Sequence, residues 1–197
     1  PHCQRVFSTG SLALLNSASA GARRDGAAFL TLGAGARAAS GPVSGRSLES
    51  EEWLDGRPAG AVFREQTGQS AAPHTVVTLD LAASLRATAA RQTGAVLGAL
   101  GTRLLQFGLR SAVVGNEDIP GEYRRWAPLL TMDRAGLTTT GVLQHGLEVR
   151  DPNAPCGRRQ DAGKVAATVQ RLSVTHALVV VEVGALSRAD FLTDQAL

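Results

Sequence analysis

The stretch that decides the fold begins with Leu12-Ala-Leu-Leu-Asn16 and continues, after a polar turn, with Ala27-Ala-Phe-Leu-Thr-Leu-Gly-Ala-Gly-Ala-Arg-Ala38. Its first part is a short apolar run, which is typical of a buried strand, and it ends in the polar Asn16. Its second part opens a helix after a small, polar and basic loop. Because ligands in open α/β sheets bind where strands end and helices begin, this stretch predicts an α/β fold with a site at the loop.

Two features limit the helix of this stretch. Asp25 is expected to cap its start, because an aspartate oxygen readily accepts a backbone N–H there. Gly33 and Gly35 either end the helix early or allow another backbone to come close, because neither residue carries a Cβ atom.

Further apolar runs and helical periodicities predict more strands and helices along the chain. Strands are predicted at Thr75–Leu79, Ser111–Val114, Val142–Leu143 and Ala177–Val183, and helices at Ala59–Thr67, Ala82–Phe107 and Ala162–Leu172. One helical turn is predicted near Leu48–Leu54, loops are predicted at Arg150–Arg159 and Gly184–Asp190, and Asp161 is expected to cap a helix. We therefore predict a layered, mostly parallel sheet flanked by helices.

Two of these predicted elements, the longest helix and the last strand, have further features in their sequence. Gly94, Gly98 and Gly101 lie inside the longest predicted helix, where they indicate close packing against a neighbour or a local break. The nearly unbroken apolar character of Ala177–Val183 favours a sheet that is covered on both faces.

Size and charge set further limits. The chain has 197 residues, of which 44% are hydrophobic, so it can bury the core of one domain, and we treat residues 1–197 as a single α/β domain. Its net charge is +3, and Lys164 is the one lysine among its 20 basic residues. The chain has three arginine pairs, Arg23-Arg24, Arg124-Arg125 and Arg158-Arg159. They are scattered among acids without aromatic stacking partners, so they predict a solvated surface and no nucleic-acid partner.

The cysteines and the hydropathy of the chain indicate neither a metal site nor a membrane span. Cys3 and Cys156 lie far apart and lack metal-ligand spacing, and whether they pair stays open. No apolar run reaches the length of a membrane span, so no transmembrane segment is predicted in this chain.

Polar residues at the ends of predicted strands are the candidate ligand-binding residues. They are Asn16, Asn116, Asp118 and Asp190. The alternative is that Asp118 and Asp190 cap helices or fix turns. No catalytic residue is evident. The histidines are His2, His74, His145 and His176, and they show no metal-ligand spacing, so no metal ligands are predicted. Gly33-Ala-Gly35 follows a predicted helix and does not open one, which disfavours a dinucleotide site, although a Rossmann-like module stays as a third alternative.

Several motifs, in a common order over most of the chain, resemble an uncharacterised bacterial branch of the alkaline-phosphatase-like superfamily. They are Thr9-Gly-Ser-Leu-Ala-Leu-Leu-Asn-Ser17, Ala28-Phe-Leu-Thr-Leu-Gly-Ala-Gly-Ala-Arg-Ala38, Val114-Gly-Asn-Glu-Asp118 with Ala127-Pro-Leu-Leu-Thr-Met-Asp133, and Leu178-Val-Val-Val-Glu-Val-Gly184 with Ser187-Arg-Ala-Asp190. The resemblance implies the fold of phosphatases, phosphodiesterases, sulfatases and cofactor-independent phosphoglycerate mutases. Such proteins hold two divalent metals beside a Thr, Ser or modified Cys nucleophile at a helix start.

The resemblance implies an extracytoplasmic or membrane-associated protein with a phosphorylated or sulfated small-molecule partner. It is either part of a metal-dependent phosphate- or sulfate-ester hydrolase or a non-catalytic binding or envelope-associated relative. This sequence departs from the pattern with Arg24-Asp25 where the nucleophile is expected and with Ala185 where an acidic residue is common. The metal ligands of the superfamily would precede Pro1 and follow Leu197, so the chain is expected to be an internal fragment. Zn, Mn or Mg would bind if the full-length protein supplied those ligands.

Overall fold

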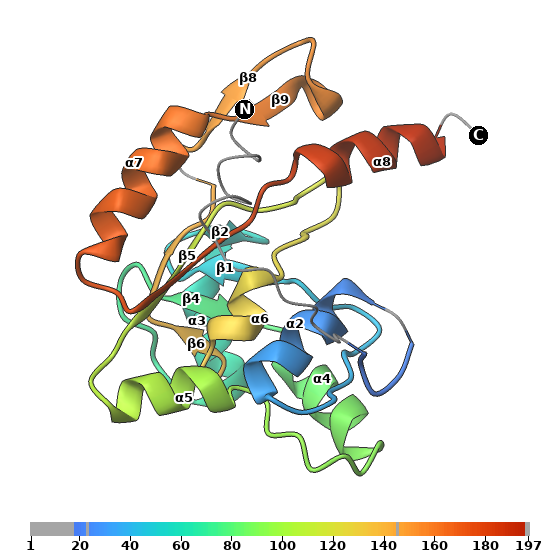
Figure 1. Ribbon diagram of the computed structural model, residues 1–197, viewed down its shortest axis with the longest axis vertical. Coiled ribbons are helices and arrows are strands. Elements are labelled where there is room, and N and C mark those ends of the chain that lie inside the picture. The colour runs from blue at the N-terminus through green and yellow to red at the C-terminus, as the bar shows by residue number, and fades with distance from the viewer. Residues whose placement is uncertain (1–17, 23, 145, 196–197) are drawn as a thin grey trace, which may run out of the picture.

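The computed structural model describes residues 18–22, 24–144 and 146–195 (Figure 1). The predicted strand Leu12–Leu15 and the candidate residue Asn16 lie outside these ranges. Within them the chain is a mixed α/β protein with seven α-helices and several small sheets, one of which is a parallel sheet of three strands. No helix in these ranges is long and apolar enough to cross a membrane.

The parallel sheet has the strand order β10-β5-β7. Its strands are β5 (Ser111–Val114), β7 (Thr140–Val142) and β10 (Leu178–Val181). The strand predicted at Ser111–Val114 is confirmed, the one predicted at Ala177–Val183 contains β10, and the one predicted at Val142–Leu143 shares only Val142 with β7. Val113 of β5 pairs with Val180 of β10 on one side and with Gly141 of β7 on the other. All four residues of the central strand β5 are buried.

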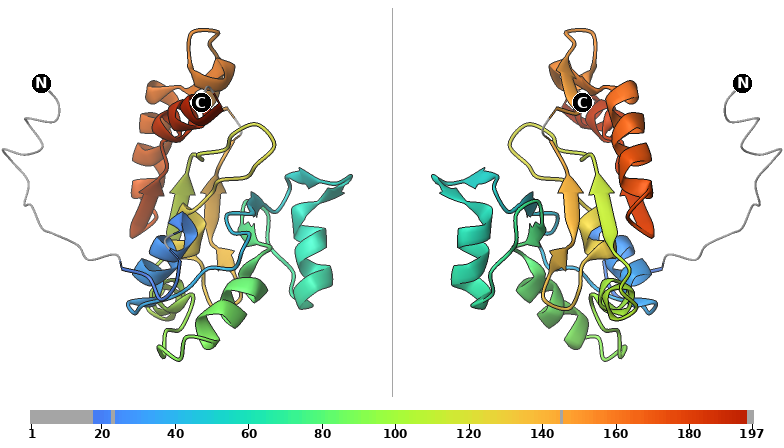
Figure 2. Two further views of the ribbon diagram at one scale, coloured as in Figure 1. Left: turned by 90° about the vertical axis from the view of Figure 1, so that its right-hand side faces the viewer. Right: turned by 90° about the vertical axis from the view of Figure 1, so that its left-hand side faces the viewer.

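Helices cover both faces of β5, since successive side chains of a strand point to opposite faces. Val113 packs in one cluster with Ala127 of α6 (Ala127–Thr131). Ala112 and Val114 pack in another with Leu172 of α7 (Ala162–Ser173). Figure 2 shows α7 on one side of the parallel strands. On the opposite side it shows the hairpin of β2 (Trp53–Leu54) and β3 (Arg57–Pro58) with α3 (Ala59–Thr67). Asp161 caps α7 as predicted by accepting the N–H of Lys164 at 3.1 Å.

Strand β10 lies at the edge of the parallel sheet and is less buried than its composition predicts. Val181 is 39% exposed, and Val183, just beyond the strand, is 59% exposed. An apolar run indicates that a strand can be buried on both faces, but it does not determine which position the strand takes within the sheet.

The other sheets are antiparallel, so the predicted mostly parallel arrangement is present only in part. One has the order β1-β4-β6 and is formed by β1 (Ser47–Glu49), β4 (Val76–Thr78) and β6 (Leu137–Thr138). The two others are the hairpins of β2 (Trp53–Leu54) with β3 (Arg57–Pro58) and of β8 (Glu148–Arg150) with β9 (Arg158–Gln160).

One local prediction in these sheets is wrong and another is confirmed in part. The helical turn expected near Leu48–Leu54 is replaced by β1 and β2, because Leu48 pairs with Val77, a partner distant in sequence that local periodicity cannot indicate. The loop predicted at Arg150–Arg159 is confirmed for residues 151–157, which connect β8 and β9 and include a 3-10 turn at Pro155–Gly157, whereas the two ends of the predicted range belong to the strands.

Helix α2 (Asp25–Ala34) packs against α6 and ends at Gly35. A Cβ atom on Gly33 would lie 2.6 Å from the backbone oxygen of Leu130, so the expected close approach is present. The capping role of Asp25 is wrong: Arg24 occupies the cap position and Asp25 is the first helical residue, so its carboxylate lies in the first turn. Helix α3 (Ala59–Thr67) ends at Gly68, as predicted.

The long predicted helix is two helices, α4 (Leu81–Ala89) and α5 (Ala99–Gln106). Gly98 adopts a left-handed φ of 76° immediately before α5, which interrupts the helix there. The predicted loop Gly184–Asp190 is also wrong, because α8 (Ala185–Gln195) begins directly after Gly184.

We expect Gly101→Ala to destabilise the fold by about 1–3 kcal/mol, because overpacking against backbone cannot relax through a rotamer change. The new Cβ atom would lie 2.2 Å from the oxygen of Met132 and 2.3 Å from that of Thr131. Gly163→Ala in α7 is the matched control, because its Cβ would meet nothing closer than an Asp161 oxygen at 3.3 Å. Urea unfolding of both variants measures the difference, and equal midpoints would contradict the proposed contact.

Candidate functional site

Two of the predicted site residues meet at the carboxyl end of β5. Asn116 and Asp118 are 1% and 7% exposed. The Asn116 amide donates to the Leu143 oxygen at 2.7 Å, and its Oδ1 accepts the N–H of Asp118 at 2.9 Å. Asp190 lies on the exposed surface of α8 and takes no part in this cluster, and Asn16 lies outside the described residues.

The guanidinium of Arg125 organises this end of the sheet. Arg125 is 0% exposed, which corrects the expectation that the Arg124-Arg125 pair is solvated. It donates to Asp118 Oδ2 through Nε at 2.9 Å and Nη2 at 2.8 Å. Its two Nη atoms donate to Glu52 at 2.6 and 2.9 Å, and Nη1 also donates to the Ser47 oxygen at 3.2 Å. Burial lowers the pKa of Arg125, but its hydrogen bonds to Glu52 and Asp118 outweigh burial and hold it above its ordinary value.

A second buried guanidinium, that of Arg188, fastens α8 to the same loop. Arg188 is 1% exposed and donates through Nε to the Asp118 backbone oxygen at 2.9 Å and through Nη2 to Asn116 Oδ1 at 3.1 Å. Nη2 also pairs with Glu148 of β8. The neighbouring Ser187 hydroxyl donates to Glu117. Arg188 of α8 therefore joins the segment after β10 to the loop after β5, where it contacts the predicted residues Asn116 and Asp118. Arg188 itself is not among the predicted site residues.

We call this set the buried ion-pair network; its members are Glu52, Asn116, Asp118, Arg125, Glu148 and Arg188. Both carboxylate oxygens of Asp118 already accept hydrogen bonds, because Oδ1 also receives the Arg124 N–H at 2.8 Å. A divalent cation therefore does not fit Asp118, since Arg125 occupies the lone pairs that a metal would need. Residues 18–22, 24–144 and 146–195 contain no group of three or more His, Cys, Asp or Glu that could hold a metal ion.

Glu182 is a further buried carboxyl group that the sequence analysis missed. It is 3% exposed at the end of β10, and its Oε1 accepts the N–H groups of Trp126 at 2.6 Å and Ala127 at 3.0 Å. Its Oε2 has no hydrogen-bond partner among the described residues. Burial, aided by the charges of Glu117 and Asp118, raises the pKa of Glu182 to about 8 against the lowering effect of those N–H groups. Glu182 is therefore mainly protonated at neutral pH.

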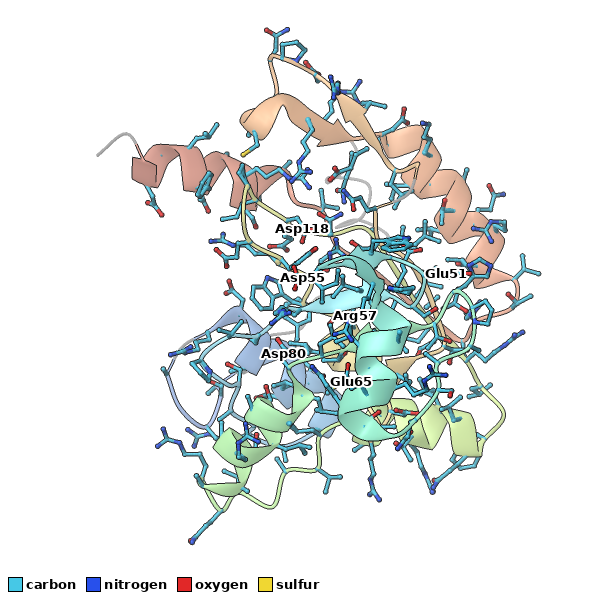
Figure 3. All side chains as sticks on the ribbon, turned by 180° about the vertical axis from the view of Figure 1, so that it is seen from behind. Glu51, Asp55, Arg57, Glu65, Asp80 and Asp118 are labelled. Carbon is cyan, nitrogen blue, oxygen red and sulfur yellow. The ribbon has the colours of Figure 1, made fainter. Side chains whose placement is uncertain are left out.

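A cleft of about 640 Å³ opens at the start of α2. We call it the arginine cleft, because Arg24, Arg46 and Arg124 line it from separate segments of the chain. Its other lining residues are Asp25, Pro42, Val43, Ser44, Leu54, Asp55, Gly121, Glu122, Tyr123 and Trp126. Asp55, which lines this cleft, and Asp118, which belongs to the buried network, are labelled in Figure 3.

The arginines of this cleft differ in how they are held. Arg24 donates to the Pro42 oxygen at 2.6 Å, and Arg124 donates to Glu122 at 3.1 Å. The Arg46 guanidinium forms no hydrogen bond or ion pair with the residues that the structure describes. Its charge does act on Asp80: burial raises the pKa of that carboxyl, and Arg46 opposes the rise. Arg46 is thus the cation of this cleft most available to a ligand.

Comparison with known proteins identifies no relative. The chain matches no family model, no curated protein and no solved structure. The likeness to the alkaline-phosphatase-like superfamily therefore stays a prediction from the sequence motifs.

We expect Arg125→Met to lower the free energy of unfolding by about 3–5 kcal/mol, because it leaves two buried carboxylates unpaired. The side chains of Asp118 and Glu52 are only 10% and 15% exposed. Arg57→Gln is the control: its ion pair with Glu65 is 58% and 67% exposed, and such surface pairs are worth at most about 1 kcal/mol. Denaturant unfolding compares the two, and equal losses would contradict the assigned role of Arg125.

Glu182 makes stability fall as the pH rises. Its carboxyl titrates near 4.5 when unfolded and at about 8 when folded, so between these values the folded state keeps a proton that the unfolded chain has released. The stabilisation is complete below pH 4.5 and is lost as the pH passes about 8. Glu182→Gln should remove this dependence while keeping an oxygen acceptor for the Trp126 N–H. Unfolding midpoints measured from about pH 5 to about 9 test this, and parallel profiles for the two proteins would disprove it.

Proposed function

We propose that this chain binds a phosphorylated or sulfated small molecule in the arginine cleft and acts as a non-catalytic, alkaline-phosphatase-like binding protein. The observation that carries the proposal is the convergence of Arg24, Arg46 and Arg124 on one cleft. A guanidinium presents N–H donors in a planar fork that matches the oxygens of phosphate and sulfate. A location outside the cytoplasm belongs to the same proposal and rests on the sequence resemblance.

The start of α2 adds to the attraction for an anion. Arg24 occupies the cap position and makes no side-chain hydrogen bond to the helix, so the first N–H groups lack a side-chain acceptor. Such a helix end carries partial positive charge and favours a bound anion. Asp25, Asp55 and Glu122 balance part of the cleft's positive charge, so we expect selectivity for a ligand that reaches Arg46.

The buried network supports binding over hydrolysis. Asn116 and Asp118, the polar residues predicted for chemistry, are committed to Arg125 and Arg188 and act as internal supports for the loop. That loop continues into Glu122, Tyr123 and Arg124, which line the cleft. The network thus positions the wall of the binding site and leaves the contacts with ligand to the arginines.

A hydrolase is the second candidate, and one observation favours it. Ser44 lies over the first turn of α2, where a Cβ atom on Gly26 would be 2.5 Å from its Oγ. Nucleophilic hydroxyls in the resembled superfamily also lie at a helix start. An assay of the full-length protein with aryl phosphates, phosphodiesters and aryl sulfates, with Zn²⁺ or Mn²⁺ added, tests it. Turnover that Ser44→Ala abolishes would favour the hydrolase over the binding protein.

We expect Arg46→Gln to weaken binding of p-nitrophenyl phosphate by roughly tenfold or more, because a charge-assisted hydrogen bond is lost. Isothermal titration with this probe and with inorganic sulfate measures the effect. Arg86→Gln on the exposed face of α4 removes the same charge away from the cleft and should leave affinity unchanged. If both variants weakened binding equally, the loss of affinity would come from the change in net charge and not from the cleft. If the parent protein bound neither probe, the proposal would be refuted.

A further inference from the structure

A second cleft, of about 820 Å³, lies on another part of the molecule and has no assigned role. We call it the β7 cleft, because Thr140, Gly141 and Val142 of that edge strand form one wall. Its other lining residues are Glu49, Glu51, Glu52, Trp53, Pro73, His74, Arg110, Thr139 and Arg171. It shares no lining residue with the arginine cleft.

Cations lie toward one end of the β7 cleft. Arg110 directly precedes β5, whose residue Ala112 pairs with Thr140 at the amino end of β7. Arg171 lies in the last turn of α7. Both residues are exposed, and neither guanidinium forms a hydrogen bond or an ion pair with residues that the structure describes. They form an unneutralised positive end.

Carboxylates lie toward the other end. Glu49 accepts the N–H of Leu143, just beyond the carboxyl end of β7, at 2.7 Å. Glu51 follows it in the chain and pairs with the His74 ring at 3.1 Å, with its side chain 56% exposed (Figure 3). Glu51 lies beside the middle of β7, because its partner His74 accepts the Gly141 N–H, whereas Arg110 lies two residues before the strand partner of Thr140. Three residues of extended chain, from Thr138 to Gly141, cover about 10 Å, which gives the approximate separation of the positive and negative ends.

Two features at the acidic end suit an organic cation. Trp53 is 69% exposed beside Glu51 and Glu52, so its ring is available to an ammonium group through a cation–π contact. His74, the partner of Glu51, has a left-handed φ of 61°, a conformation that costs energy for a residue with a side chain. The backbone there is held by the hydrogen bond from the Gly141 N–H to the His74 oxygen at 3.0 Å.

We infer that the β7 cleft binds the free termini of a short peptide in an extended conformation. The ammonium group lies between Trp53 and Glu51, and the carboxylate lies at Arg110 and Arg171. An extended tripeptide spans about 10 Å, which matches the separation of the two ends. A free amino acid is too short to reach both, and a peptide with blocked termini lacks the charges. The volume of the cleft lies within the roughly 300–1,000 Å³ of ordinary ligand sites.

Titration of the intact chain with trialanine tests the inference, with tryptophan fluorescence and chemical-shift changes as readouts. Trialanine should bind, whereas N-acetyl-trialanine, trialanine amide and free alanine should each bind about tenfold more weakly or worse. If trialanine amide bound as tightly as trialanine, the arginines would not recognise the carboxylate. If N-acetyl-trialanine bound as tightly as trialanine, Glu51 and Trp53 would not recognise the ammonium group. Either result, or no binding of trialanine, would overturn the inference.

Variants localise the site. Arg171→Gln should weaken trialanine binding about tenfold and leave trialanine amide binding unchanged, since the amide makes no ion pair there. Arg103→Gln, on the exposed face of α5, is the charge-matched control and should change neither. Arg46→Gln affects only p-nitrophenyl phosphate binding, so failure of the peptide site and failure of the phosphate site are separate results. Trialanine binding that survives Arg171→Gln unchanged would disprove the placement of the carboxylate.

Discussion

The guanidinium of Arg125 is the interaction on which the rest of the structure depends. It holds the loop after β5 to the chain that leads from β1 to β2, so the parallel and antiparallel sheets meet across one buried cation. Taking an arginine and two carboxylates out of water is costly, and only a complete set of hydrogen bonds offsets that cost. The geometry of both clefts follows from it, because Glu52 and Trp53 on one side and Glu122 to Arg124 on the other are attached to this point.

The sequence predicts elements well where local chemistry determines them. The central strand Ser111–Val114, the helix Ala59–Thr67 ended by Gly68 and the Asp161 cap of α7 are confirmed, because each depends on neighbours in the chain. Strand β1 was missed because its partner β4 is distant in sequence, and the long helix was predicted whole because its apolar periodicity continues across the break at Gly98. Local patterns carry no information on the pairing of β1, and for the helix Gly98 signals either a break or close packing without deciding between them.

In the candidate site, too, the sequence predicts residues that carry a local signal and misses those whose role depends on distant partners. Asn116 and Asp118 were found because polar residues after an apolar strand are a recognisable signal, whereas Arg125 and Arg188 look like surface arginines until the fold buries them. Glu182 did carry a signal, since it is a carboxyl group within an apolar run, and it lies buried directly after β10. Partners of a buried charge come from segments far apart, so sequence spacing cannot pair them.

That distance along the chain governs how the protein folds. The bonds from Arg125 to Glu52 and from Arg188 to Asn116 join residues separated by 73 and 72 positions. Contacts of such long range form only after large loops have closed, which makes folding slow compared with a helical protein of this size. Until then the arginines and carboxylates stay hydrated, so their dehydration belongs to the last steps of folding.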